Sequence, residues 1–317
     1  MFEQQAKRYH DSIFIRYQLP NTQDFKTLSY SQVDCISTNL ANEWSFNLKG
    51  IKTVGLVADH SIYYLVTMLA IFKLQPILLA LSPRNSVEAN IDLMKKTDSH
   101  FIIASTKYAD AVNQCAKKIP GGCNVKIFEP FDLEKLSQPN TTTVRPDSET
   151  ASLKDIDKVV LIIHSSGSTA YPKPIRLSNR YMFGLVQTLG LQMQEDVHCL
   201  EPSDVMLASL PLFHVFGIFC HFLPMLLGAS CLILGRIPPT AGETATVIDK
   251  HNVTILALPP MILEQIAEYI DEKPEAEEIY GRIKFSIYGG ASLRRQVGDY
   301  LNSKGINIRA AYGTTGK

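Results

Sequence analysis

The chain has 317 residues with 31 basic and 31 acidic side chains, and 45% of its residues are hydrophobic. This composition is typical of a soluble protein with one large or two medium domains, and the balanced charge excludes a general attraction to nucleic acid or to an anionic membrane. Six cysteines without a CxxC pair argue against a zinc site and a secreted disulfide framework. The polar amino terminus lacks the apolar segment of a signal peptide, so we expect a cytoplasmic location.

Amphipathic stretches alternate with short apolar runs through the first half of the chain. The amphipathic stretches predict helices and the apolar runs predict strands. In chain order we expect helices at Ser31–Trp44, Ser61–Phe72 and Ala89–Thr97, and strands at Thr53–Val57, Pro76–Leu81 and Phe101–Ala104. This alternation indicates a parallel α/β sheet.

A polar stretch rich in Thr, Ser and Pro, Ser137–Leu153, reads as a connector and is the one convincing internal seam. It predicts a first α/β subdomain at residues 1–150 and a second at residues 151–317. The second begins with an expected strand, a polar loop, another strand and a helix that Ser178 or Asn179 caps. The expected elements that follow the connector are Val159–Ile163, Ile175–Leu177, Thr254–Leu258, Met261–Ile270, Ile283–Tyr288 and Arg294–Ser303.

The segment Val205–Gly235 carries no Asp, Glu, Lys or Arg and is long enough to cross a bilayer. Pro211, Pro224 and Gly228 interrupt it, however, which favours a buried strand–helix–strand unit over a membrane span. We expect the helix at Val215–Leu227, with Gly228 as its stop and a strand at Cys231–Leu234.

The loop after the strand at Val159–Ile163 is the most informative stretch for chemistry. It reads HSSGSTAYPKP from His164 to Pro174, so that small hydroxyl residues surround a glycine and a lysine follows. Backbone N–H groups, hydroxyls and a mobile cation in this order suit a polyphosphate. No GxxxxGK[ST] occurs and the loop runs from strand to strand, so it is not a Walker loop. A solvated turn is the alternative interpretation.

Three further stretches hold candidate site residues, and each has a structural alternative. In Pro211–Gly217 the histidine is either a pocket residue or a satisfied core histidine, and in Tyr288–Leu293 two glycines also fit a plain strand-to-helix turn. The third stretch is Ala311–Gly316. The candidates are Phe213, His214 and Gly217 in the first, Gly289, Gly290 and Ala291 in the second, and Tyr312, Gly313, Thr314 and Thr315 in the third.

Together these four stretches resemble, in order, the motifs of the adenylate-forming superfamily, which includes acyl-CoA synthetases, luciferases and nonribosomal-peptide adenylation domains. The runs Pro172–Ile175 and Ser82–Ser86 look most like the adenylation domains of fungal synthetase-like carboxylic acid reductases. The resemblance covers nearly the whole chain. It implies the amino-terminal core of the adenylate-forming fold, with two mostly parallel sheets flanked by helices, and without the barrel subdomain and the small carboxy-terminal domain.

The resemblance also implies a reaction, in which ATP activates a carboxylic acid as an acyl-adenylate and pyrophosphate leaves. Lys173 and Thr315 are then the catalytic candidates, Tyr312 stacks on adenine, and the acid pocket contains Phe213, His214, Gly217 and Gly290. The implied ATP-binding residues are Ser165, Ser166, Gly167, Ser168, Thr169, Lys173, Gly289, Gly290, Ala291, Tyr312, Gly313, Thr314 and Thr315. The implied partners are a carboxylic acid, ATP and, in a full-length protein, a carrier-protein or CoA thiol, with no nucleic acid and no membrane.

Two departures from the family pattern open an alternative. Ala170 replaces a loop glycine, and Gly316 stands where the family has a glutamate that binds magnesium, so no protein ligand for a metal is assigned. The chain also stops before the ribose aspartate, the hinge and the catalytic lysine of the family. We therefore expect a truncated product or fragment that is poorly active alone, and the alternative is a non-catalytic nucleotide-binding or scaffolding remnant. No aspartate follows Phe213, which favours an acid without an α-amino group.

Overall fold

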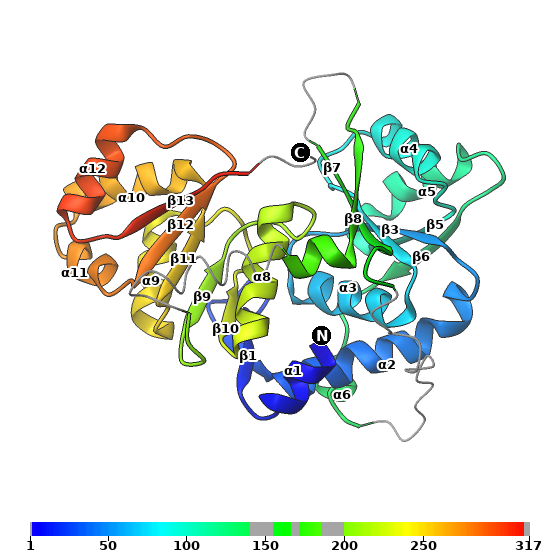
Figure 1. The fold of residues 1–317 in the computed structure, drawn as a ribbon, viewed down its shortest axis with the longest axis horizontal. Coiled ribbons are helices and arrows are strands. Elements are labelled where there is room, and N and C mark those ends of the chain that lie inside the picture. Colours follow the sequence, from blue (N-terminus) through cyan, green and yellow to red (C-terminus); the bar gives the residue numbers. More distant parts are fainter. Residues whose placement is uncertain (1, 140–154, 166–170, 185–199, 314–317) are drawn as a thin grey trace.

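The computed structural model describes residues 2–139, 155–165, 171–184 and 200–313. These residues form two β-sheets, each flanked by helices, and the two sheets lie on opposite sides of the molecule (Figure 1). Most strands in both sheets are parallel, so the α/β fold expected from the alternating pattern is confirmed. The expected connector lies largely outside the described residues.

The first sheet has six strands in the order β6-β5-β3-β4-β7-β8. All neighbours are parallel except β7 and β8, which pair antiparallel. The strand bounds are β3 (Thr53–Val57), β4 (Ile77–Ala80), β5 (Phe101–Ser105), β6 (Asn124–Phe128), β7 (Val159–His164) and β8 (Pro174–Ser178). The predicted strand–loop–strand arrangement around the candidate phosphate loop is therefore present as a hairpin.

The second sheet has seven strands in the order β13-β12-β11-β9-β10-β1-β2. Only β1 and β2 pair antiparallel. The bounds are β1 (Ile13–Gln18), β2 (Phe25–Ser29), β9 (Val205–Ala208), β10 (Ser230–Ile233), β11 (Ile255–Leu258), β12 (Phe285–Gly289) and β13 (Ile308–Ala311). The sequence pattern does not predict the amino-terminal hairpin β1–β2, whose apolar and polar residues do not alternate regularly.

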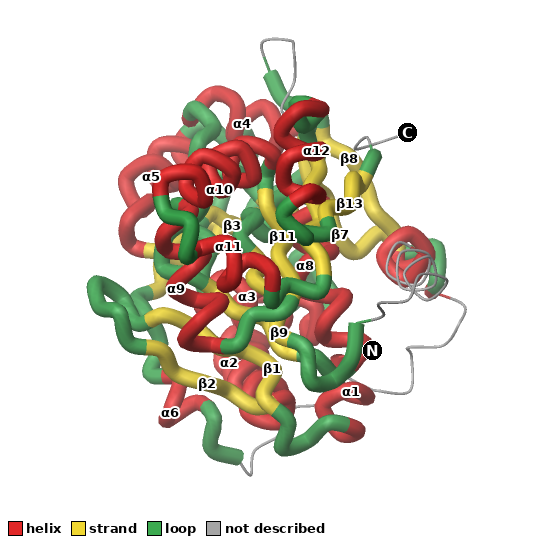
Figure 2. The backbone as a smooth tube through the Cα atoms, turned by 90° about the vertical axis from the view of Figure 1, so that its left-hand side faces the viewer, coloured by secondary structure: helices red, strands yellow, loops and turns green. Residues whose placement is uncertain are grey.

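Helices cover the faces of both sheets. Figure 2 shows α9, α10 and α11 on the outer face of the seven-stranded sheet. The helices are α1 (Phe2–Arg8), α2 (Tyr30–Leu48), α3 (Ile62–Leu74), α4 (Val87–Lys96), α5 (Ala109–Lys117), α6 (Leu133–Leu136), α8 (Val215–Leu227), α9 (Ala241–His251), α10 (Pro260–Glu272), α11 (Ala276–Gly281) and α12 (Arg295–Ser303), with a short 3₁₀ turn η1 (Thr106–Tyr108).

Local signals set several helix ends. Ser29 and Gln32 form a capping box that starts α2 one residue before the predicted Ser31, and the Ser178 hydroxyl accepts from the Tyr181 N–H at 3.2 Å, as a cap there requires. Gly228 ends α8 with φ of 80°, which confirms the predicted stop. Thr240 and Glu243 form a second capping box at α9, a helix that the apolar pattern alone did not reveal.

The sheets exchange strands across the predicted seam. Strands β7 and β8 follow the connector in sequence but complete the first sheet, whereas β1 and β2 precede it and complete the second. The division into residues 1–150 and 151–317 therefore stays a prediction about subdomains, and it does not describe sheet membership. Such an exchange ties the two halves together through backbone hydrogen bonds.

One hydrophobic cluster joins the two sheets. Alternate residues of a strand point to opposite faces, so Leu56 of β3 and Met206 of β9 enter the shared cluster, together with α2, α3 and α8. The neighbouring residues Val57 and Leu207 face outward, into separate clusters under α4–α5 and α9–α12. The chain thus forms five layers, with the shared cluster as the central one.

Helix α8 lies in this central layer and is buried along nearly all its length. Tyr30, at the start of α2, is fully buried, and its hydroxyl donates to the carbonyl oxygens of Ala229 at 2.8 Å and Pro224 at 3.1 Å. Pro224 lies in the last turn of α8 and Ala229 follows the Gly228 stop, so the Tyr30 hydroxyl ties the start of α2 to the end of α8. Among the described residues, no helix combines the length and apolar character needed to cross a membrane.

Two histidines meet inside the central layer. The rings of His60, before α3, and His221, on α8, are 5.1 Å apart and buried. The His221 Nδ1–H donates to the Gly217 carbonyl oxygen at 2.7 Å, and its Nε2 atom has no hydrogen-bond partner among the described residues. Burial lowers the pKa of His221 to about 4 and lowers the pKa of His60 well below its usual value.

We expect the free energy of unfolding to rise with pH between about 4 and 6.5. In this window the unfolded chain binds protons on these imidazoles and the folded chain does not, so each histidine contributes a slope of up to about 1.4 kcal/mol per pH unit. His221→Phe should flatten the slope measured by urea unfolding across this range. An unchanged slope in that variant and in His60→Leu would contradict the assignment.

Candidate functional site

The predicted motifs all follow the carboxyl ends of strands. The phosphate-loop candidate follows β7, the motif Pro211–Gly217 follows β9, and the glycine pair and Tyr312 follow β12 and β13. In open α/β sheets, ligands bind outside the carboxyl ends of the strands. The sequence order of the motifs thus becomes one spatial cluster, to which both sheets contribute.

Residues Ser165 and Lys173 close the base of the hairpin loop. The Ser165 N–H donates to the Lys173 carbonyl oxygen at 3.1 Å, and the Lys173 N–H donates to the Ser165 hydroxyl at 3.3 Å. This pair extends the β7–β8 ladder by one step and leaves the Lys173 side chain exposed. Residues 166–170, which include the candidates Ser166, Gly167, Ser168 and Thr169, lie outside the described residues.

A buried histidine ties the loop base to a neighbouring turn. His164, the last residue of β7, accepts on Nε2 from the Ser82 N–H at 3.1 Å, and the Asn85 side chain lies 3.3 Å from the same atom. A nitrogen that accepts from a backbone N–H carries no proton, so the neutral ring holds its proton on Nδ1. Burial lowers the pKa of His164, which favours this neutral form.

His214 connects the two sheets at the site. It is the N-cap residue of α8 and its side chain is exposed, while the neighbouring Phe213 is buried with its ring 4.8 Å from the imidazole. Partial desolvation lowers the pKa of His214, and the nearby His164 and the positive Arg84 lower it further. His214 comes from the seven-stranded side and both of these neighbours from the six-stranded side, so the motifs approach each other across the junction.

Close backbone approaches explain two glycines of the motifs. A Cβ atom at Gly217 would lie 2.0 Å from the Pro211 carbonyl oxygen, and one at Gly289 would lie 2.8 Å from the Ala311 carbonyl oxygen and 3.2 Å from the Phe216 ring. Only glycine fits at these distances. The ring of Phe216 therefore brings the start of α8 against the ends of β12 and β13, so that three of the four motifs pack together.

The remaining described candidates form an exposed rim. Gly290 has a φ of +86°, a conformation that only glycine adopts easily, and Ala291 and Gly313 are exposed. The Tyr312 side chain is 97% exposed, so one full ring face is free to stack on a base. Thr314, Thr315 and Gly316 lie outside the described residues, and their roles stay predictions.

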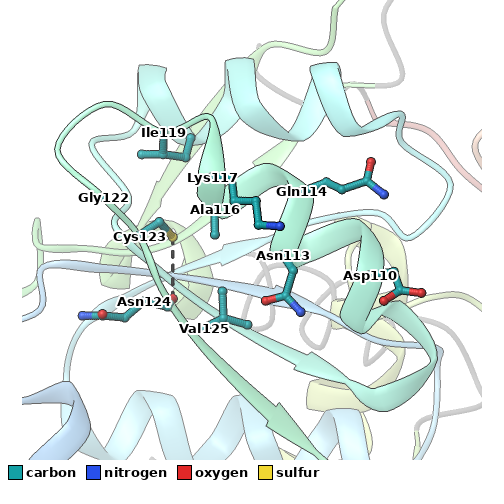
Figure 3. Close-up of a pocket in the computed structure, with 10 residues that line it drawn as sticks. All are labelled: Asp110, Asn113, Gln114, Ala116, Lys117, Ile119, Gly122, Cys123, Asn124 and Val125. Carbon is teal, nitrogen blue, oxygen red and sulfur yellow. Dashed lines mark hydrogen bonds between the residues drawn. The ribbon is translucent and has the colours of Figure 1, made fainter.

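Other features do not compete for the chemistry. Within the described residues, no group of three or more His, Cys, Asp or Glu is placed to hold a metal ion. A shallow depression between α5 and β6 contains none of the predicted site residues (Figure 3). Its lining includes Lys117 and Cys123, whose Sγ donates to the Asn124 carbonyl oxygen at 3.6 Å.

The sequence prediction missed what holds the site together. In the sequence, His164 only marks the start of the loop, and Arg84 and Asn85 only belong to a family-like turn. Their meeting depends on β4 and β7 being sheet neighbours, which sequence spacing does not reveal. The one available signal was that both segments follow strands expected to be parallel.

The chain belongs to the AMP-binding enzyme family, whose model matches residues 2–316. Among curated relatives, an adenylate-forming reductase of Aspergillus terreus is 26% identical over 326 residues, covering 98% of this chain and 29% of the relative. A carboxylic acid reductase of Neurospora crassa is 25% identical, covering 81% of this chain and 24% of the relative. The chain therefore spans about a quarter of these fungal relatives, and the predicted recognition is confirmed.

Solved structures agree on the fold. The luciferase-like enzyme of the mealworm Zophobas morio superposes with a TM-score of 0.79 at 20% identity, covering 99% of this chain and 71% of that chain. The o-succinylbenzoate CoA synthetase of Bacillus subtilis, solved with ATP and magnesium, gives 0.76 at 17% identity, covering 99% and 59%. The chain thus has the two-sheet core of the adenylate-forming fold.

We expect Gly217→Ala to destabilise the protein by about 3 kcal/mol or more, because the new Cβ atom overlaps the Pro211 carbonyl and separates α8 from the turn that precedes it. Gly281→Ala is the matched control, since a Cβ atom there meets nothing within 4 Å, and its effect should stay within about 1 kcal/mol. Chemical unfolding of both variants measures the difference. Equal stability of the two would contradict the packing described here.

Proposed function

We propose that this chain binds ATP and takes part in activating a carboxylic acid as an acyl-adenylate. The observation that carries the proposal is the meeting of the four motifs at the carboxyl ends of both sheets, with His214 close to His164 across the junction. An oxygen of the acid attacks the α-phosphorus of ATP, a new P–O bond forms, and the bond to pyrophosphate breaks. Proteins assist such transfers mainly by positioning and by electrostatic stabilisation.

Each part of the site has a proposed role. Lys173, Ser165 and the loop residues Ser166, Gly167, Ser168 and Thr169 hold the β- and γ-phosphates, and Tyr312 stacks on adenine above Gly289, Gly290 and Ala291. Gly313, Thr314 and Thr315 lie beside the α-phosphate, and Lys173 and Thr315 lie nearest to the reacting atoms. The acid lies beside Phe213, His214, Gly217 and Gly290. The exposed Lys173 ammonium and the free Tyr312 ring support these assignments.

Magnesium accompanies ATP in the solved B. subtilis relative. In this chain, Gly316 supplies no carboxylate, and the described residues contain no acidic cluster that would replace one. We therefore assign no protein ligand to magnesium and derive no step through it. A thiol of CoA or of a carrier protein is the proposed acceptor, as the family's acyl-transfer chemistry implies.

Nucleotide binding without turnover is the second candidate function. The same Gly316 favours it, because loss of a metal-binding carboxylate weakens catalysis more than it weakens adenine stacking. Steady release of pyrophosphate on addition of ATP and a panel of carboxylic acids separates the two functions. Binding without such release at rates near about 1 per second would support the non-catalytic function.

We expect isothermal titration with ATP and magnesium to show saturable binding that Lys173→Ala weakens roughly tenfold or more, since a charged hydrogen bond to phosphate is lost. Lys117→Ala is the matched control. Lys117 is a lysine of the depression in Figure 3, away from the motifs, and its removal should leave the affinity unchanged. Equal loss in both variants, or no binding by the unmodified chain, would contradict the proposed site.

A further inference from the structure

One cationic residue near the base of the candidate phosphate loop has no role in the proposed function. Arg84 lies in the turn that follows β4, where its backbone N–H donates to the Ser82 hydroxyl at 3.2 Å, and its side chain is exposed. Arg180, Arg282 and Arg294 each pair with a carboxylate. Arg84 forms no ion pair with any described residue, so its guanidinium is available to an anionic ligand.

The turn that carries Arg84 is fixed to the base of the loop. Ser82 and Asn85, on either side of Arg84, both bond to Nε2 of the buried His164, and the Asn85 amide also donates to Asn90 at 2.9 Å. His164 directly precedes Ser165, the first residue of the loop base. The backbone of Arg84 therefore keeps a set position relative to Ser165 at the loop base, through the buried His164 ring.

The position of Arg84 follows from the hydrogen bonds that hold its turn to His164, at the carboxyl end of β7. Strand β4, which the turn follows, is the sheet neighbour of β7, so Arg84 lies at the edge of the first sheet that carries the candidate phosphate loop. Its positive charge also contributes to the lowered pKa of His214, on the side of the second sheet. A guanidinium is a planar fork that binds two phosphate oxygens at once, whereas an ammonium such as that of Lys173 acts as a point charge.

We propose that Arg84 is a second cationic residue that binds the polyphosphate of ATP and the leaving pyrophosphate, and that His164 is the positioning residue that holds the Arg84 turn against the loop. This inference rests on the proposed nucleotide site. Lys173 and Arg84 then approach the phosphates from two sides, one from the hairpin and one from the neighbouring turn. Loss of the guanidinium should weaken the binding of ligands that carry the β- and γ-phosphates and leave the affinity for a ligand that lacks them unchanged.

The test compares ATP, inorganic pyrophosphate and AMP, each with magnesium, by titration calorimetry on the full chain. We expect Arg84→Gln to raise the Kd for ATP and pyrophosphate roughly tenfold, with a change of less than about twofold for AMP. Arg84→Lys should restore part of the affinity, because charge remains while the fork is lost. Arg282→Gln is the control. Arg282 is an exposed arginine that precedes the amino end of β12, whereas the candidate glycine turn lies at the carboxyl end of that strand.

His164→Asn tests the positioning role, with Asn85→Ala as a second variant if the first does not fold. In the double variant with Arg84→Gln, the two effects on ATP should not add, because both remove the same contact. Additive effects would overturn the positioning role, and an unchanged Kd, or an equal loss for all three ligands, would overturn the role of Arg84. If the unmodified chain binds none of the ligands, the proposed function fails, and the inference fails with it.

Discussion

Helix α8 carries no charge and has to be buried on every side, and this constraint organises the rest of the molecule. Two sheets satisfy it by sharing one hydrophobic cluster around α8, α2 and α3. The Tyr30 hydroxyl donates to the carbonyl oxygens of Pro224 in the last turn of the helix and of Ala229 just after it, and Gly217 lets the first turn of the helix approach the Pro211 carbonyl. The cost of this arrangement is a pair of buried imidazoles that must stay neutral.

Because His214 is the N-cap residue of α8, the burial of the helix also determines where the site lies. Its first turn emerges between the carboxyl ends of the two sheets, so that Phe216 packs against the glycine turn after β12 while His214 approaches the hairpin side. The exchange of β1–β2 and β7–β8 across the middle of the chain holds the two sheets together at this junction. A nucleotide site shared by both sheets is the expected consequence of such a fold.

Much of the fold was predictable from the sequence, because long apolar or amphipathic segments report their own burial. The strand at Thr53–Val57, the helix at Val215–Leu227 and the glycine stop agree residue for residue. The sheet membership of β1–β2 and the contact of His164 with Ser82 were not predictable, since both depend on long-range pairing. The site motifs are found through their resemblance to a family, and that resemblance includes Arg84 in the run Ser82–Ser86 without assigning it a role, which only its neighbours in space suggest.

The central claim is that ATP lies between the β7–β8 loop and the exposed ring of Tyr312. A crystal structure of this chain grown with ATP and magnesium tests it most directly. The account predicts adenine stacked on Tyr312 beside Gly289 and Gly290, with the phosphates extending to Lys173. A nucleotide bound elsewhere, for example in the depression between α5 and β6, or a loop base in which Ser165 and Lys173 have separated, would contradict it.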